Sequence, residues 1–158
     1  SPNRPVIYRD YAQCFQLNNK NLEAISLYQN NLNLLPSADN ILLNDEHRAY
    51  LNFYKSRIYT NIALAQEATN QLNQALESWH LVYSYYPENL FSLEKRAEIY
   101  LIQKQYDLAI FWLKHAYSRQ PYFYHWPLAI ANIYNLKGEK TLFDYWHNQA
   151  ILLNSDLK

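Results

Sequence analysis

The chain repeats itself with a period of 34 residues, most clearly between positions 72 and 121. A shift of one period superposes four pairs of landmark residues: Leu72 on Tyr106, Ala75 on Ala109, Trp79 on Leu113, and Pro87 on Pro121. A second shift superposes Ala97 on Ala131, Tyr100 on Tyr134, and Ala116 on Ala150. A fixed period of this size indicates stacked supersecondary units. Such stacks present binding surfaces and seldom carry catalytic chemistry.

The amino-acid composition limits the fold classes and the kinds of partner that the chain can have. The 158 residues are 49% hydrophobic and include one glycine, which excludes a disordered chain and disfavours an all-β fold rich in tight turns. Fourteen basic and fourteen acidic residues balance, without a long basic run, so we expect no nucleic-acid partner. No apolar run approaches the length needed to span a membrane, which is about 18 residues or more.

Cys14 is the only cysteine, so neither an internal disulfide nor a cysteine metal cluster is expected. Its neighbours Ala12 and Phe15 predict that it is buried. Only 18% of the residues are charged, which inclines us towards a bacterial periplasmic or envelope protein. The absence of methionine and of a signal-peptide pattern predicts an excised domain or a processed form.

Apolar spacing predicts helices throughout the chain. The expected helices cover 6–17, 20–33, 45–69, 72–85, 90–103, 105–118, 126–136 and 139–153. They pair into four hairpins at 6–36, 45–87, 89–121 and 123–155. The pairing treats 1–158 as a single domain after a short tail at 1–5.

An insertion at 37–55 breaks the period. Pro36 and Pro87 are 51 residues apart, which is one period plus 17 residues. Residues 37–40 have loop chemistry, and either Asn44 or Asp45 is expected to cap the helix that follows. That helix is predicted to carry extra N-terminal turns beyond the stack.

At the landmark residues of the 34-residue repeat, the sequence resembles the tetratricopeptide repeat (TPR) family. That family favours large residues at positions 4, 7, 11, 17 and 24 of each repeat, small ones at 8, 20 and 27, and proline at 32. The second repeat matches at Tyr59, Ile62, Ala63, Leu72, Ala75, Trp79 and Pro87, and the third at Leu93, Ala97, Tyr100, Tyr106, Ala109, Leu113, Ala116 and Pro121. The first repeat matches more loosely, at Tyr8, Tyr11, Ala12, Phe15, Ala24, Tyr28 and Pro36, and the fourth at Ile130, Ala131, Tyr134, Gly138 and Ala150, with Phe143 replacing the usual alanine. The resemblance implies an all-α, right-handed superhelix of TPR-like hairpins.

No catalytic centre is expected. The five histidines, His47, His80, His115, His125 and His147, have no metal-ligand spacing such as HExxH. A single glycine leaves no Gly-rich phosphate loop. We therefore expect no enzyme activity, no metal and no cofactor.

The resemblance implies that the first helix of each hairpin lines a concave groove. The groove positions hold Arg9, Gln13, Gln16, Arg57, Asn61, Leu64, Phe91, Glu94, Lys95, Glu98, Leu101, His125, Leu128, Asn132 and Asn135. Amide side chains suit an extended peptide because they both donate and accept hydrogen bonds. The expected function is a protein-interaction scaffold that helps to assemble a larger complex, such as one for a pilus, secretion or polysaccharide export.

Three alternatives remain open. Some TPR proteins clamp the C-terminal carboxylate of heat-shock chaperones, and the corresponding positions here are Arg9, Gln13, Asn61, Phe91 and Lys95, with Phe91 departing from the pattern. The aromatic residues Tyr122, Phe123, Tyr124 and Trp126 could bind a glycan, although packing between hairpins is the preferred interpretation. The chain could also be a regulatory domain of an enzyme.

The last helix is apolar on more than one side, and no covering helix is evident after it. We expect Leu142, Tyr145 and Trp146 to contribute an exposed contact surface for a partner or a second copy of the chain.

Overall fold

The computed structural model describes residues 5–36 and 44–157, without the side chains of residues 5–8 and 11. Predictions for the tail, for residues 37–40 and for the side chains of Tyr8 and Tyr11 therefore lie outside the described residues. Within the described part the chain is all-helical, which confirms the fold class expected from the repeat. None of the described helices is both long and apolar enough to cross a membrane.

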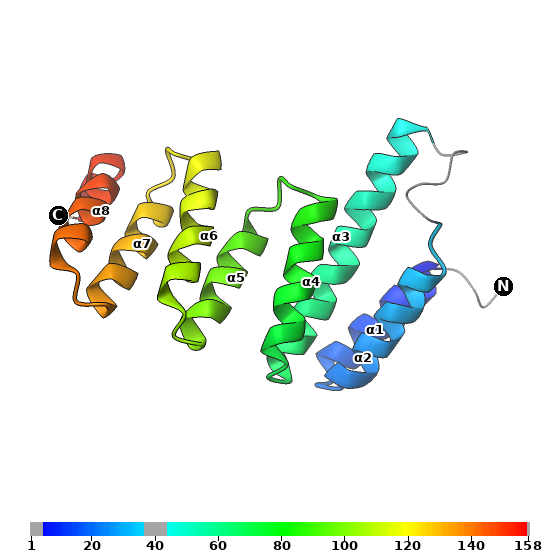
Figure 1. The fold of residues 1–158 in the computed structure, drawn as a ribbon. Coiled ribbons are helices and arrows are strands. Elements are labelled where there is room, and N and C mark those ends of the chain that lie inside the picture. The colour runs from blue at the N-terminus through cyan, green and yellow to red at the C-terminus, as the bar shows by residue number, and fades with distance from the viewer. Residues whose placement is uncertain (1–4, 37–43, 158) are drawn as a thin grey trace. The chain divides into compact units, whose positions relative to one another are not determined.

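Eight α-helices and one short 3₁₀ helix make up the described chain (Figure 1). They are α1 (Pro5–Leu17), α2 (Asn21–Asn33), α3 (Asp45–Ala68), α4 (Leu72–Tyr85), α5 (Phe91–Ile102), α6 (Tyr106–Arg119), α7 (His125–Leu136), α8 (Lys140–Leu153) and η1 (Ser155–Leu157). The α-helices begin and end within about one residue of the bounds expected from apolar spacing. The contacts divide the chain into two compact units, unit 1 at residues 1–92 and unit 2 at residues 93–158.

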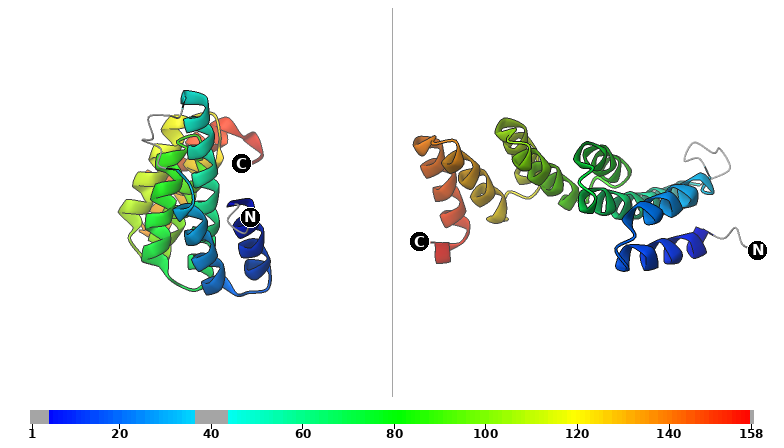
Figure 2. Two further views of the ribbon diagram at one scale, coloured as in Figure 1. Left: turned by 90° about the vertical axis from the view of Figure 1, so that its right-hand side faces the viewer. Right: turned by 90° about the horizontal axis from the view of Figure 1, so that it is seen from below.

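Unit 1 contains the hairpins α1–α2 and α3–α4, whose helices run antiparallel (Figures 1 and 2). One cluster of buried side chains joins α1, α2 and α3; its members are Ala12, Ala24, Ile25, Tyr28, Ile58, Ile62 and Ala65. Alanine at three of these positions lets the helix backbones approach closely, and Tyr28 fills the remaining space with no exposed surface. Unit 1 therefore has a core of its own.

Unit 2 contains most of α5 together with α6, α7 and α8. Its buried apolar residues are Leu93, Ala97, Ile99, Ala109, Ile110, Leu113, Ala116, Trp126, Ile130, Ala131, Ile133, Tyr134 and Ala150. Arg96 is also buried, and its guanidinium carbon lies 3.5 Å from the ring centre of Trp112. Burial lowers the pKa of Arg96, and a hydrogen bond with Tyr100 acts in the opposite direction. The cation is thus held against an aromatic face inside unit 2.

The same turn closes all four hairpins. One residue in each has a left-handed backbone: Asn19 (φ 59°), Asn70 (φ 58°), Lys104 (φ 58°) and Gly138 (φ 74°). Around Lys104, the Lys104 N–H bonds to the Leu101 carbonyl at 2.9 Å and the Gln105 N–H to the Tyr100 carbonyl at 2.8 Å. The other three turns repeat this pair of bonds, which satisfies the last carbonyls of the first helix.

Asn44 caps α3, which decides between the two residues expected for that role. Its side-chain oxygen accepts a hydrogen bond of 2.8 Å from the His47 N–H. Asp45 and Glu46 follow in the first turn, where negative charge suits the helix N-terminus. The helix then runs without a break to Ala68, so the additional turns predicted for it are present.

The expectation that Cys14 is buried is wrong, because its side chain is exposed. Ala12 is the buried residue of this stretch. Successive residues of an α-helix are rotated by about 100°, so a residue two positions further along points away from the core. The apolar neighbours of Cys14 in sequence are not its neighbours on the helix surface.

Candidate functional site

Four of the predicted groove residues line one cavity in unit 1. Arg9 and Gln13 reach it from α1, and Arg57 and Asn61 reach it from α3. Both pairs are spaced four residues apart, which places each pair on one face of its helix. The cavity has a volume of about 410 Å³.

The cavity is also lined by Tyr50, Phe53, Tyr54 and Ile58, which lie on α3 like Arg57 and Asn61, and the three rings form an aromatic wall. Tyr50 and Tyr54 are stacked with their ring centres 6.5 Å apart. The sequence analysis missed these aromatic residues because it used the family's groove positions. In the second repeat those positions begin at Arg57, after the insertion that contains the three rings. Extending the face of Arg57 back by three, four and seven residues would have found all three rings.

The unit 1 cavity is positively charged. Its lining includes two arginines and no carboxylate. Arg9 donates to the Asp10 carboxylate at 2.9 Å, and this hydrogen bond raises the pKa of the Arg9 guanidinium. Arg57 has no ion pair with any described residue, and its guanidinium carbon lies 6.0 Å from the ring centre of Phe53. Arg57 is therefore the cation that remains available to a ligand.

Two further polar groups lie at this cavity. The Tyr54 hydroxyl is buried and has no hydrogen-bond partner among the described residues. Asn61 interacts with Tyr28, a buried tyrosine of α2. Burial raises the pKa of the Tyr28 phenol, and the nearby Asn61 amide acts against that shift. The Tyr28 hydroxyl donates to the Gln16 side chain at 3.2 Å.

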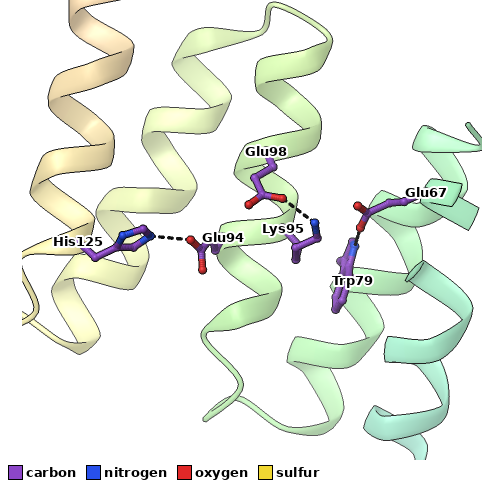
Figure 3. A network of polar contacts seen from close by, with 6 residues as sticks. All are labelled: Glu67, Trp79, Glu94, Lys95, Glu98 and His125. Atoms are coloured by element: carbon purple, nitrogen blue, oxygen red, sulfur yellow. Dashed lines mark hydrogen bonds and ion pairs between the residues drawn. The ribbon is translucent and has the colours of Figure 1, made fainter. Parts of the chain in front are cut away.

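Five other groove residues line a cavity of about 250 Å³ in unit 2: Glu94, Glu98, Leu101, His125 and Asn132. Its remaining lining residues are apolar: Ala97, Leu113, Ala129, Ile133 and Leu136. His125 points from α7 towards Glu94 of α5, and its Nε2 lies 2.6 Å from the Glu94 carboxylate (Figure 3). This cavity combines an apolar lining with two carboxylates.

Lys95 and Phe91 are not among the residues that line either cavity. The Lys95 ammonium donates to Glu98 at 2.6 Å, and its side chain is only 16% exposed (Figure 3). Phe91 is half-exposed and packs edge-on against Trp79 at 5.6 Å between ring centres. Of the positions expected for a carboxylate clamp, the structure thus brings together Arg9, Gln13 and Asn61.

Trp79 also anchors a polar contact within unit 1. It is fully buried, and its indole N–H donates to the Glu67 carboxylate at 2.6 Å (Figure 3). Next to it, the Ser78 hydroxyl donates to the Gln66 side chain at 2.7 Å in a buried hydrogen bond. These contacts fix α4 against α3 and keep the face that bears Arg57 and Asn61 in place.

The aromatic cluster before α7 is divided between core and surface. Trp126 is 4% exposed, whereas Tyr122 is 89% exposed, and Phe123 lies exposed beside it. On α8, Leu142 and Tyr145 are exposed. Trp146 is half-buried and packs edge-on against Tyr117 at 5.7 Å.

Within the described part of the chain, no group of three or more His, Cys, Asp or Glu side chains is placed to hold a metal ion.

Comparison with known proteins identifies the fold. No protein-family model matches the sequence, and no curated protein matches it significantly. A crystal structure of MamA matches with a TM-score of 0.74 and 13% identity over 99% of this chain and 81% of that one. A putative kinesin light chain from Podosopora anserina, with nearly identical TPR-like repeats, matches with a TM-score of 0.61 and 19% identity over 99% of this chain and 77% of that one. The chain has a TPR-like fold.

A second MamA structure, residues 41 to the end of the protein from Desulfovibrio magneticus RS-1, extends the likeness. It matches with a TM-score of 0.66 and 14% identity over 96% of this chain and 76% of that one. At such low identity the likeness concerns the fold alone.

Proposed function

We propose that the chain is a non-catalytic protein-interaction scaffold that binds a peptide segment of a partner protein. The observation that carries this proposal is the grouping of predicted groove residues into two cavities, four residues in unit 1 and five in unit 2. Each cavity combines an amide side chain with charged groups and apolar or aromatic surface. That combination suits a peptide, which presents backbone hydrogen-bonding groups together with alternating side chains.

The larger role that we propose is assembly of a multiprotein complex. A stack of hairpins offers a long surface from a short chain, which is the way repeat proteins hold their partners. A complex of the bacterial envelope, for a pilus, for secretion or for polysaccharide export, is the setting that we favour. Support for this setting is compositional and comes from the low charged fraction of 18%.

Selection from a displayed library of random peptides tests the proposal. The selected peptides are made synthetically and their affinity is measured by fluorescence anisotropy. We expect the variant Gln13→Ala/Asn61→Ala, or Asn132→Ala, to weaken binding by about tenfold, because each change removes hydrogen bonds to the ligand. Asn30→Ala on α2 and Asn148→Ala on α8 are matched controls, since both amides are exposed and line neither cavity.

Failure to enrich any peptide, or affinities that the cavity variants leave unchanged, would refute the proposal. Two other outcomes point to the alternatives. Peptides that need a free C-terminal carboxylate and Lys95 would favour the carboxylate clamp. A tryptophan fluorescence response to polysaccharide fragments that Tyr122→Ala removes would favour the glycan-binding interpretation.

A further inference from the structure

We infer that the unit 1 cavity selects an internal acidic side chain of the partner peptide, an aspartate or glutamate next to an aromatic or large apolar residue. The inference rests on the proposed function and specifies the ligand of one of its two cavities. It concerns the cavity formed by Arg9, Gln13, Arg57, Asn61 and the aromatic wall of α3.

The charge of the lining favours a carboxylate. Arg9 and Arg57 supply two positive charges, and no acidic side chain lines the cavity. Asp10 engages Arg9 from outside the lining, so Arg9 is already partly neutralised. Arg57 has no such partner among the described residues. A negatively charged ligand group would therefore pair chiefly with Arg57.

The geometry around Arg57 favours a planar acceptor. A guanidinium presents its N–H groups as a flat fork, which matches the two oxygens of a carboxylate. The adjacent Phe53 ring, 6.0 Å from the guanidinium carbon, restricts where that fork can point. Asn61 follows Arg57 by one helical turn and lines the same cavity, so its amide can donate to the ligand as well.

The Tyr54 hydroxyl gives a second, independent indication of a ligand. It is buried without a partner among the described residues, on a side chain that lines the cavity. Buried hydroxyls in proteins are nearly always hydrogen-bonded, and an unpaired one is unfavourable. The hydroxyl is closed to solvent in this structure, so the Tyr54 ring has to turn for a carboxylate in the cavity to become its acceptor.

The inserted turns of α3 indicate which type of residue lies beside the acidic residue in the bound peptide. Tyr50 is 69% exposed and Phe53 is 40% exposed, so both rings present free surface at the cavity. Both precede position 56, where the regular 34-residue repeat resumes, and so belong to the inserted segment. An aromatic or large apolar residue beside the acidic one would cover these rings. The selection of an acidic residue with such a neighbour is thus a property of the insertion and not of the repeat pattern.

The test compares the peptides selected by the native protein with those selected by Arg57→Gln. Fusion of the library at its C-terminus excludes free terminal carboxylates. We expect peptides selected by the native protein to be enriched in aspartate or glutamate beside an aromatic or apolar residue, and those selected by Arg57→Gln to lack the acidic enrichment. Arg119→Gln is the matched control, because Arg119 is exposed on α6 and lines neither cavity.

A double-mutant cycle then locates the contact. A selected peptide is synthesised with a C-terminal amide, together with a version in which glutamine replaces its acidic residue. The native protein should bind the acidic peptide about tenfold more tightly than the glutamine version, and Arg57→Gln should abolish that preference. Thermal melting of Arg57→Gln checks that the variant is folded.

Four outcomes overturn the inference. Enrichment of peptides without acidic residues would refute it and leave the proposed function intact. Acidic enrichment that persists in Arg57→Gln would assign the selectivity to another site. Binding of a selected peptide when it is synthesised as the free acid, but not as the C-terminal amide, would show that a terminal carboxylate is the ligand. Failure to enrich any peptide would remove the proposed function and the inference together.

Discussion

Lys104 is the residue whose side chain suits its backbone least. The first, second and fourth hairpin turns place asparagine or glycine in the left-handed conformation. The third turn places Lys104 there, at φ 58°. Side chains with a Cβ pay for this conformation by about 1–2 kcal/mol, against an entropic cost of about 0.5–1 kcal/mol for glycine. We expect Lys104→Gly to raise the free energy of unfolding by about 0.5–1 kcal/mol, measured by urea denaturation.

Gly138→Ala provides the reverse test in the fourth turn. A Cβ added at Gly138 meets no atom within 4 Å, so only the backbone strain at φ 74° changes. Destabilisation should be about 1 kcal/mol. A neutral result for both variants would show that the left-handed turns are not limiting for stability.

Single residues show where sequence reasoning succeeds and where it fails. Asn19, Asn70 and Gly138 interrupt the helical pattern and are residues that turns favour, so sequence alone marks those turns. Lys104 carries no such signal, because its conformation is imposed by the helices on either side. Cys14 was misplaced because sequence neighbours were taken for neighbours in space.

At the scale of elements, α3 begins with a side-chain cap, whereas α2, α4, α6, α7 and α8 begin without one. Its first turns belong to the insertion, and its N-terminal residues Asp45, Glu46 and His47 are exposed. Asn44→Ala removes the acceptor for the His47 N–H. We expect this change to cost about 1 kcal/mol in the free energy of unfolding and to speed amide exchange in the first turn of α3.

Asn44→Asp is the matched control because it keeps a side-chain oxygen at the cap. Its stability should equal that of the native protein. Equal exchange rates in Asn44→Ala and the native protein would contradict the importance of the cap. Because Tyr50 and Phe53 lie within the first turns of α3, fraying of these turns should also lower the affinity of the unit 1 cavity for its selected peptides.

Helices were the part of the fold that sequence predicted best. Apolar residues at helical spacing, with Asn and Pro between them, fixed the bounds of all eight α-helices to within about one residue. The candidate site was harder to predict from the sequence. The groove positions implied by the family resemblance included Arg9, Gln13, Arg57 and Asn61, which line one cavity. They did not include the aromatic wall, because the family pattern has no positions inside an insertion.

At the scale of the whole molecule, the two units should differ in their response to local damage. Ile62 is buried in the unit 1 core and Ile130 is buried in unit 2. Either isoleucine changed to alanine should cost about 2–5 kcal/mol, through lost burial and a residual cavity. We expect Ile62→Ala to accelerate amide hydrogen exchange chiefly in α1–α4, and Ile130→Ala chiefly in α7 and α8.

Hydrogen exchange read by mass spectrometry of peptic fragments distinguishes the two patterns. In a repeat protein each hairpin is stabilised by its nearest neighbours, so damage in one unit should leave the other largely protected. Equal acceleration over the whole chain in both variants would show that the units unfold as one body. The division at residue 92 was not predicted, because the 34-residue period continues across it.

The position of the tryptophans gives the two units separate optical signals. Trp79 is the sole indole of unit 1, whereas Trp112, Trp126 and Trp146 all belong to unit 2. With phenylalanine at the latter three positions, and with excitation that selects tryptophan over the 16 tyrosines, fluorescence emission would originate from Trp79 alone. Since Trp79 is buried and donates to Glu67 on α3, its emission would respond to loosening of the hairpin that bears Arg57. The chain thus contains its own spectroscopic reporter for the unit that bears the Arg57 cavity.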